Sequence, residues 1–266
     1  MPQGRLLATL KTLFYDLRST AKLSGNMRSR FRLSLDFALS RIIGLIPPQS
    51  RNRVREVVLR ENIKIRYRLN KGDINTIREI WLDEAYCGPL GKPSGVLLDL
   101  GANIGMTTVW LTRKFAFAQV IAVEPDPGNA ALLRQNLNLN KINGQVLEAA
   151  IGPQDGIARF NYSNISNQGQ LSENGSPVAM LSVDTIIKKF EVTKFGLVKI
   201  DIEGGEQALF EGPTAWLGCT DAIVIEFHPP EVDYPRLAAL VSSHGFKYIP
   251  AHSFVPDNLD IFTRIS

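Results

Sequence analysis

The sequence predicts an α/β protein, with a mostly parallel β-sheet covered by helices on both faces and a basic helical extension before it. Two observations lead to this prediction. From residue 96 onward, short apolar segments alternate with segments of helical periodicity, which is typical of parallel strands buried on both faces. Residues 1–60 differ, because they hold 12 Lys or Arg and three Asp or Glu, a net charge of +9 in a chain whose total is +4.

The first part of the chain predicts helices followed by a strand. Residues 1–50 indicate one or two helices that end at the pair Pro47-Pro48, because proline does not continue a helix. Residues Ile63–Leu69 alternate apolar and basic side chains, which is the period of a half-buried strand.

A helix and a loop connect this strand to the sheet. Residues Asp73–Tyr86 carry apolar side chains on one helical face, and Asp73 is a suitable N-cap. The Gly- and Pro-rich segment Cys87–Gly95 predicts a boundary loop. We therefore expect a basic helical extension over residues 1–56 and a main domain over residues 57–266.

The core of the main domain, residues 96–266, follows an added strand and helix in residues 57–95. Its expected strands are GVLLDLG, QVIAVEP, QVLEAAIG, FGLVKIDIEG and DAIVIEFHP, and its expected helices are MTTVWLTRKF, GNAALLRQNLNLN, EQALFEG and YPRLAALVSSHGF. The polar segment Ser163–Ser176 predicts a loop, while KYIPAH and DIFTRIS, with PDN between them, predict a terminal antiparallel hairpin. Such sheets bind ligands at the carboxyl ends of their strands, so the residues there form the candidate site.

The composition is that of an ordinary globular protein, with 44% apolar and 21% charged residues. The two cysteines, Cys87 and Cys219, have no metal-ligand spacing and indicate reduced thiols in a cytoplasmic protein. No apolar run approaches the ~18 residues of a membrane span, and the N-terminus lacks the pattern of a secretory signal. We therefore expect a cytoplasmic protein without a transmembrane segment.

The basic charge of residues 1–60 predicts an acidic partner, such as a carrier protein, an anionic glycan or a membrane surface. The alternative is a solvated helical extension without a partner. No aromatic platform or base-reading motif accompanies the charge, so a nucleic-acid partner is not expected.

The segment DLGANIGM, residues 99–106, places glycines after an apolar strand, which indicates close approach of the backbone to a ligand. A P-loop is excluded because the glycines have the wrong separation and no Lys-Ser or Lys-Thr follows. A dinucleotide fingerprint is disfavoured because Asn103 and Met106 occupy positions that need glycine. The carboxylate of Asp99 also disfavours a pyrophosphate and favours a cationic ligand.

S-adenosylmethionine meets this electrostatic demand, since it carries an ammonium and a sulfonium and has no phosphate. Gly101 and Gly105 let the backbone approach its methionine portion, and Asp99 can serve the ammonium directly or through water. Asn103 lies in the turn, where its amide can satisfy the backbone or the ligand. At the end of the second strand, Glu124 is placed to accept hydrogen bonds from the ribose hydroxyls.

Several segments, in this order, resemble the FkbM family of S-adenosylmethionine-dependent methyltransferases: LLDLGANIGMTTVWL, VIAVEPDPGNAALLRQNLNLN, LEAAIG, LVKIDIEGGEQALFEG and DAIVIEFHP. The resemblance runs from Ile63 to the C-terminus and does not cover residues 1–50. It implies the Rossmann-like class I methyltransferase fold, with seven strands of which the last is antiparallel. It also implies methyl transfer to a hydroxyl oxygen of a sugar, a glycan or a secondary metabolite, either free or bound to a carrier.

Methyl transfer needs a nucleophilic oxygen within about 3–3.5 Å of the methyl carbon, and a general base can remove the proton of that oxygen. The segment LVKIDIEGGE places Asp201 at the end of the fourth strand, with Glu203 beside it. We expect Asp201 to face the methyl group and the acceptor as a base or orienting group. Glu203 is expected to share this work or to contact the ammonium, and Glu206 to interact with the dipole of the following helix.

The fifth strand is followed by two further polar residues, Glu226 and His228. The intrinsic pKa of histidine suits base chemistry, so His228 is a third candidate catalytic residue, with a structural hydrogen bond as the alternative. Asp201 and Glu226 are potential Mg²⁺ ligands, but no third ligand is evident, so no metal is assigned.

The candidate catalytic residues are thus Asp201, Glu203 and His228. The candidate cofactor-binding residues are Asp99, Gly101, Ala102, Asn103, Gly105, Glu124, Pro125, Ala150 and Asp201. Ala150 is expected to line the adenine site, and the resemblance suggests that Tyr86 covers the cofactor. Packing in the core is the alternative for both residues.

Two alternatives to a methyltransferase remain open at this point. A binding protein could keep the cofactor fold without turnover, although the glycine turn and the strand-end carboxylates together argue against it. An NAD-dependent oxidoreductase on a doubly wound sheet is disfavoured by Asn103, by Met106 and by the segment KIDIEGGE.

Overall fold

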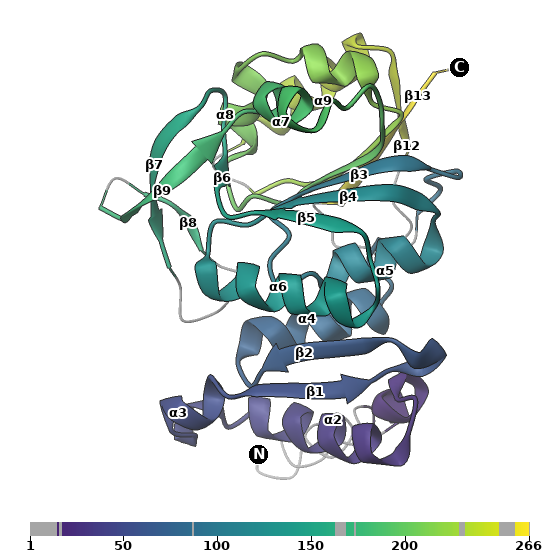
Figure 1. Cartoon of the computed structure of the whole chain (residues 1–266), viewed down its shortest axis with the longest axis vertical. Helices are drawn as coiled ribbons and strands as arrows, with labels where there is room; N and C mark the ends of the chain where they lie inside the picture. The colour runs from purple at the N-terminus through teal and green to yellow at the C-terminus, as the bar shows by residue number, and fades with distance from the viewer. Residues whose placement is uncertain are drawn as a thin grey trace, which may run out of the picture.

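The computed structural model describes residues 15, 18–86, 88–162, 169–172, 174–228, 232–249 and 259–265 (Figure 1). Its centre is a seven-stranded sheet. From one edge to the other the strands are β12 (Phe246–Ile249), β13 (Leu259–Arg264), β11 (Ala222–Glu226), β10 (Phe195–Ile200), β3 (Gly95–Leu100), β4 (Phe117–Val123) and β5 (Gly144–Leu147). β13 pairs antiparallel with both of its neighbours, whereas the pairs from β11 to β5 are parallel.

This sheet confirms the predicted fold class and the closing antiparallel pair, β12 and β13. The turn expected at PDN lies outside the described residues. The central strand β10 shows why the strands have continuous apolar sequences, because all six of its residues are buried. A strand that is covered on both faces has no solvent-facing positions that would favour polar residues.

Helices cover both faces of the sheet. On one face lie α5 (Met106–Lys114) and α6 (Pro127–Leu139), and on the other lie α7 (Val183–Phe190), α8 (Glu206–Glu211) and α9 (Tyr234–Ser243) (Figure 1). The sequence predicted all of these helices except α7. Each face buries its own cluster of apolar side chains against the sheet. Among the described residues, no helix is both long and apolar enough to span a bilayer.

The N-terminal residues form a hairpin flanked by helices. α2 (Met27–Ser40) packs on β1 (Val54–Val58), which pairs antiparallel with β2 (Lys64–Arg68) (Figure 1). β2 confirms the predicted strand, whereas β1 was not predicted. The domain boundary expected after residue 56 falls inside β1, and the division into domains otherwise stays a prediction.

The pair Pro47-Pro48 does not end the preceding long helix, contrary to the prediction. α2 ends at Ser40, and a short 3₁₀ turn, Ile43–Leu45, follows. Pro48 instead begins the short helix α3 (Pro48–Arg51). Proline is tolerated in the first turn of a helix, where its missing N–H would have no partner within the helix.

The start of α4 (Lys71–Trp81) corrects a second prediction. Its N-cap is Asn70, whose side chain accepts a hydrogen bond from the Asp73 N–H at 2.7 Å, so Asp73 is not the N-cap. The carboxylate of Asp73 is fully buried, accepts from the Arg68 N–H at 2.7 Å and pairs with the Arg68 guanidinium at 3.1 Å. Aspartate is common near helix starts both as the N-cap and as a residue of the first turn, so the sequence did not distinguish these two positions. α4 ends at Trp81, before the predicted end at Tyr86.

Asparagine side chains of α6 attach the hairpin to the core. The Asn136 Oδ1 accepts from the Arg66 N–H at 2.6 Å, and its Nδ2 donates to the Arg66 carbonyl at 3.0 Å. Asn140 makes the same pair of bonds with Lys64, at 3.1 and 2.7 Å. The edge of β2 that does not pair with β1 is therefore hydrogen-bonded to side chains of α6. These bonds satisfy backbone N–H and C=O groups that an open strand edge would leave to solvent.

A second, smaller sheet lies beside the carboxyl ends of the main strands. Its strands are β6 (Ala150–Ile151), β9 (Ser176–Leu181), β7 (Gly156–Asn161) and β8 (Gln170–Leu171), in this spatial order. The loop predicted over Ser163–Ser176 was wrong at β8 and at the first residue of β9. Residues 163–168 and 173, which belong to the same prediction, lie outside the described residues.

Candidate functional site

The turn after β3 brings two strand ends into direct contact. Gly101 has φ +78°, and a Cβ at this position would lie 1.7 Å from the Asp201 carbonyl oxygen. A side chain is therefore excluded both by the backbone conformation and by the segment after β10. Gly105, with φ +84°, is the residue before α5, where a Cβ would meet Leu133 of α6 at 2.5 Å.

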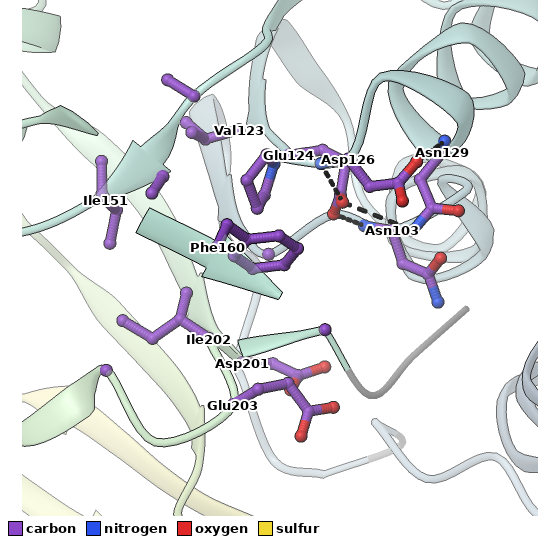
Figure 2. Close-up of a pocket in the computed structure, with 16 residues that line it drawn as sticks. Asn103, Val123, Glu124, Asp126, Asn129, Ile151, Phe160, Asp201, Ile202 and Glu203 are labelled. Carbon is purple, nitrogen blue, oxygen red and sulfur yellow. Dashed lines mark hydrogen bonds between the residues drawn. The ribbon is translucent and has the colours of Figure 1, made fainter. Parts of the chain in front are cut away.

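Two adjoining cavities open where β3, β4 and β10 end. The first is lined by residues of the strand ends and of the small sheet, as is usual for a ligand site in a sheet of this kind. One wall is apolar and includes Phe160 and Ile151, whereas Glu124 lies on the side of Asn103 (Figure 2). Asp201 and Glu203 lie along a third side (Figure 2). The cavity therefore combines an apolar wall with carboxylates from two different strand ends.

The second cavity is more polar than the first. The residues that line both cavities are Gly101, Asn103, Asp201 and Glu203. The N-terminal part of the chain supplies another wall, with Thr76, Glu79, Ile80 and Tyr86. The added strand and helix thus complete the site, because without α4 the second cavity would be open on this side.

A buried lysine links the strand ends beneath the cavities. The Lys199 ammonium donates to the Gly101 carbonyl at 2.8 Å and lies 3.3 Å from Asp99 and 3.2 Å from Asp201. Burial by itself would lower the pKa of Lys199, but the carboxylates of Asp201 and Asp99 outweigh it and raise the pKa. The ammonium therefore stays charged. Asp99 also accepts a bond from the Thr108 hydroxyl at 2.6 Å.

Glu124 holds the glycine turn to the start of α6. Its carboxylate accepts from the Asn103 N–H at 2.8 Å and from the Asp126 N–H at 2.9 Å (Figure 2). The residue is buried, and this burial raises the pKa of Glu124 to about 7 in spite of the two backbone bonds. The turn also places Asn103 at φ +50°, with its Oδ1 buried and, among the described residues, without a hydrogen-bond partner. Asn103 itself lines the site.

Several carboxylates surround His228 at the end of β11. The imidazole Nδ1 lies 2.8 Å from Glu206, and Nε2 lies 3.5 Å from Glu203 and 3.8 Å from Asp201. Glu226 lies 3.9 Å from the same Nε2. Glu206, expected to serve only the helix dipole, is instead the fully buried partner of the imidazole.

Because of these contacts, the candidate bases His228 and Glu203 have different pKa values. Burial would lower the pKa of His228, but the neighbouring carboxylates, Glu206 first, raise it to about 9. The free imidazole is thus protonated at neutral pH and is not poised as a base. Burial and the charge of Asp201 raise the pKa of Glu203 to about 7, which suits a general base at neutral pH.

The structure brings most of the predicted site residues to the cavities. The predicted residues that line at least one cavity are Gly101, Ala102, Asn103, Glu124, Pro125, Ala150, Asp201 and Glu203. Tyr86 also lines the second cavity, and Ala150 lines the first. The contacts predicted between these residues and a cofactor stay predictions.

Three predicted site residues do not line either cavity. Asp99 is fully buried beneath the turn. It pairs with Lys199, which lines the second cavity. Gly105 packs against α6, and His228 lies beside Asp201 and Glu203 without lining the cavities. These residues support the site from outside the cavities.

The sequence analysis missed three residues of the site. Lys199 had a signal, because a charged residue inside a buried apolar strand needs an ionic partner. Phe160 and Glu79 had none, since β7 and α4 reach the cavities only through the tertiary fold.

The fold and the site define a class I methyltransferase: a seven-stranded sheet closed by an antiparallel strand, with a ligand cavity at the carboxyl ends of its parallel strands. The family model of the methyltransferase FkbM domain matches residues 99–248 of this chain. The chain belongs to the FkbM methyltransferase family.

Relatives of this chain carry methyltransferase names. It is 22% identical to methyltransferase 1 of Beauveria bassiana, over 71% of this chain and 87% of that one. It is 24% identical to the 31-O-demethyl-FK506 methyltransferase FkbM of Streptomyces tacrolimicus, over 68% and 85% of the two chains. It is 30% identical to the hexuronic acid methyltransferase AglP of Haloferax volcanii, over 59% and 63%.

A solved structure shares the fold. The crystal structure of an FkbM methyltransferase from Methylobacillus flagellatus superimposes with a TM-score of 0.50 and 15% sequence identity. The match covers 96% of this chain and 60% of that one. At this level of identity the likeness supports the fold alone.

The buried ion pairs of Lys199 predict a large stability effect. Lys199→Met should lower the free energy of unfolding by about 3–5 kcal/mol, because it leaves Asp99 buried without a counter-charge. Adding Asp99→Asn should recover part of this loss. The matched control is Lys194→Met, which removes an exposed pair with Asp221 and should change stability by less than about 1 kcal/mol. Urea unfolding measures all three, and equal effects of the two lysine variants would contradict the prediction.

The raised pKa of Glu124 predicts a pH-dependent stability. Its folded pKa of about 7 exceeds the ordinary value of 4.5, so its protonated form favours the folded state. That stabilisation should be complete below pH 4.5 and be lost as the pH rises through 7, a change of about 3 kcal/mol. Urea unfolding of the natural chain and of Glu124→Gln from pH 5 to 8 isolates the effect, because glutamine does not titrate. A difference between the two proteins that is constant with pH would refute it.

Proposed function

We propose that this protein transfers a methyl group from S-adenosylmethionine to a hydroxyl oxygen of a sugar, a glycan or a secondary metabolite. The observation that carries the proposal is the first cavity, which joins an apolar wall to carboxylates at the ends of β4 and β10. S-adenosylmethionine supplies an electrophilic methyl group on a sulfonium centre. The cavity matches the parts of that molecule: an apolar base, a hydroxylated ribose and a positive charge.

The apolar wall suits the adenine. Phe160 and Ile151 from the small sheet, with Val123 and Pro125 from the end of β4, form a largely apolar surface around this side of the cavity. An aromatic side chain binds a flat base well, because the two surfaces exclude water and their ring quadrupoles interact.

The acidic groups suit the rest of the cofactor. The Glu124 Oε2 accepts one short backbone hydrogen bond, from Asn103, and keeps a second lone pair for a ribose hydroxyl. The Oε1 accepts from the Asp126 N–H and, at 3.4 Å, from the Asn129 side-chain amide. Asp201 and Glu203 face the cavity from the other side, where negative charge stabilises a sulfonium or an ammonium (Figure 2). A pyrophosphate at the same place would meet these carboxylates, which disfavours the NAD-dependent alternative.

Proton removal is assigned to Glu203. Its pKa of about 7 leaves a substantial fraction ionised at neutral pH, and it lines both cavities. Asp201, held by the Lys199 ammonium at 3.2 Å, keeps a fixed orientation towards the cavities. The protonated His228 stabilises the pair of carboxylates rather than acting as the base.

The names of two relatives support an oxygen acceptor. One is named for the 31-O position of FK506 and the other for hexuronic acid. The second cavity is polar and adjoins the first, which suits a hydroxylated acceptor. The alternative of a cofactor-binding protein without turnover predicts cofactor binding but no methylated product.

Phe160 allows a direct test of cofactor binding. S-adenosylmethionine should bind to the natural chain in calorimetry, and Phe160→Ala should weaken binding about tenfold by removing the aromatic wall. The matched control is Ile157→Ala, since Ile157 is 79% exposed on the same strand and should not matter. Binding of NAD without binding of S-adenosylmethionine would overturn the proposal. Incubation with a labelled methyl donor and candidate sugars, followed by mass spectrometry, then tests turnover.

A further inference from the structure

We propose that Asp201, Glu203 and His228 bind a divalent transition-metal ion of the Mn²⁺ or Zn²⁺ kind. One ligand atom from each of these side chains lies within 4.8 Å of the other two. The three residues come from the ends of neighbouring strands, β10 and β11, so the pairing of these strands sets their spacing. The mixture of two carboxylates and one imidazole suits Mn²⁺ or Zn²⁺ better than Mg²⁺, which prefers oxygen ligands alone.

The orientation of the imidazole is an independent observation. Glu206 fixes Nδ1 at 2.8 Å, which turns Nε2 towards the carboxylates of Asp201 and Glu203. A carboxylate that holds the far nitrogen of a histidine is the usual outer partner of a metal-bound imidazole. It sets the ring orientation and raises the basicity of the ligating nitrogen.

Glu206 also shows a need for positive charge on this side of the site. The side chain is fully buried, and its Oε2 has no hydrogen-bond partner among the described residues. A buried carboxylate with an unsatisfied oxygen is costly unless positive charge lies nearby. In the free protein the protonated imidazole supplies that charge, and a metal ion on Nε2 of His228 would replace the proton there and keep the ring positively charged.

The ion would act on the proposed reaction, so its catalytic consequence rests on the proposed function. A hydroxyl oxygen bound to a divalent ion loses its proton more readily. Each carboxylate supplies one oxygen as a ligand, so the second oxygen of Glu203 remains to accept that proton. The acceptor oxygen then forms a bond to the methyl carbon while the carbon–sulfur bond breaks, and the sulfonium becomes a neutral thioether.

Metal binding can be measured without any methyl acceptor. The full chain should reduce the electron paramagnetic resonance signal of free Mn²⁺ in a saturable titration. His228→Gln should remove most of this binding, and Glu206→Gln, which alters only the outer partner, should weaken it about 10- to 100-fold. The matched control is His244→Gln, since His244 is similarly half-buried and contacts Thr214 instead of carboxylates.

The competing explanation is that a protonated imidazole alone balances the carboxylates. In that case Mn²⁺ stays free up to millimolar concentration, and the metal site is refuted. Equal binding by the natural chain and both site variants also refutes it. Circular dichroism checks that each variant is folded, and Asp201→Asn is a second ligand variant if His228→Gln does not fold. Calorimetry with S-adenosylmethionine separates the two ideas, because cofactor binding without metal binding leaves the proposed function standing.

A second proposal concerns the outer face of α2. We propose that this face binds an anionic membrane surface. Met27 and Phe31 are 74% and 72% exposed, and Leu35 follows one turn later on the same side of the helix. Leu45, in the turn after α2, is 83% exposed. Met27, Phe31 and Leu35, which we call the α2 patch, are large apolar side chains that face solvent.

Arginines flank the α2 patch and identify its partner. At 3.6 residues per turn, Arg28 and Arg32 lie on one side of the stripe and Arg30 on the other, and all three are exposed. A helix with an apolar stripe between basic residues matches an interface of acyl chains and anionic headgroups. A second copy of the chain would bring these arginines close to one another, so charge favours the lipid surface over a dimer.

Vesicle sedimentation tests this surface. The full chain should sediment with vesicles of phosphatidylcholine and phosphatidylglycerol, and much less with phosphatidylcholine alone or at high salt. Phe31→Ser should weaken binding about tenfold. The matched control is Ile157→Ser, which removes an equally exposed side chain from β7 and should not change binding. Equal loss in both variants, no sedimentation, or a dimer that Phe31→Ser dissociates would each overturn the proposal.

Discussion

The ammonium of Lys199 is the interaction on which the site depends. It lies on β10 but bonds to Gly101 and Asp99 at the end of β3, so one buried charge joins two neighbouring strand ends. Its third partner, Asp201, faces both cavities. The carboxylate proposed to face the methyl donor is therefore positioned from below by the same group that holds the glycine turn. A charge buried in this way is tolerated only because its partners are also buried or fixed.

The glycine turn shows how the scaffold and the site share the same residues. A motif of this kind suggests that the backbone approaches a ligand, and Gly101 does line both cavities. The closest neighbour of a Cβ at this position would nevertheless be the carbonyl oxygen of Asp201, so protein packing alone already excludes a side chain. Glu124 has a similar double role, since it holds Asn103 and Asp126 while it lines the first cavity. Substitutions at either position alter the shape of the site as well as its contacts.

The N-terminal hairpin contributes to the site through its attachment to the core. Asn136 and Asn140 of α6 pair with the edge of β2, and α4 follows β2 directly in the chain. Asn136 also donates to the carbonyl of Ile104 at 2.8 Å, inside the glycine turn. The same helix therefore positions both the turn and the added strand. This arrangement explains why α4 completes the second cavity, and why the outer face of α2 lies on the far side of the hairpin from the sheet (Figure 1).

The sequence by itself determined the parallel sheet, its covering helices and the acidic strand ends, because burial on both faces imposes continuous apolar strands and leaves polar residues at their tips. It did not predict β1 or most of the small sheet, whose segments are short and partly exposed. It also missed α7, although the sequence of that short helix is strongly amphipathic. The roles of particular side chains were decided by the tertiary structure. Asp99 and Gly105 turned inward to Lys199 and Leu133, while Phe160 and Glu79 reached the cavities from elements distant in the chain. Sequence patterns record which faces of an element are buried, but the neighbours of each side chain depend on how the elements pack.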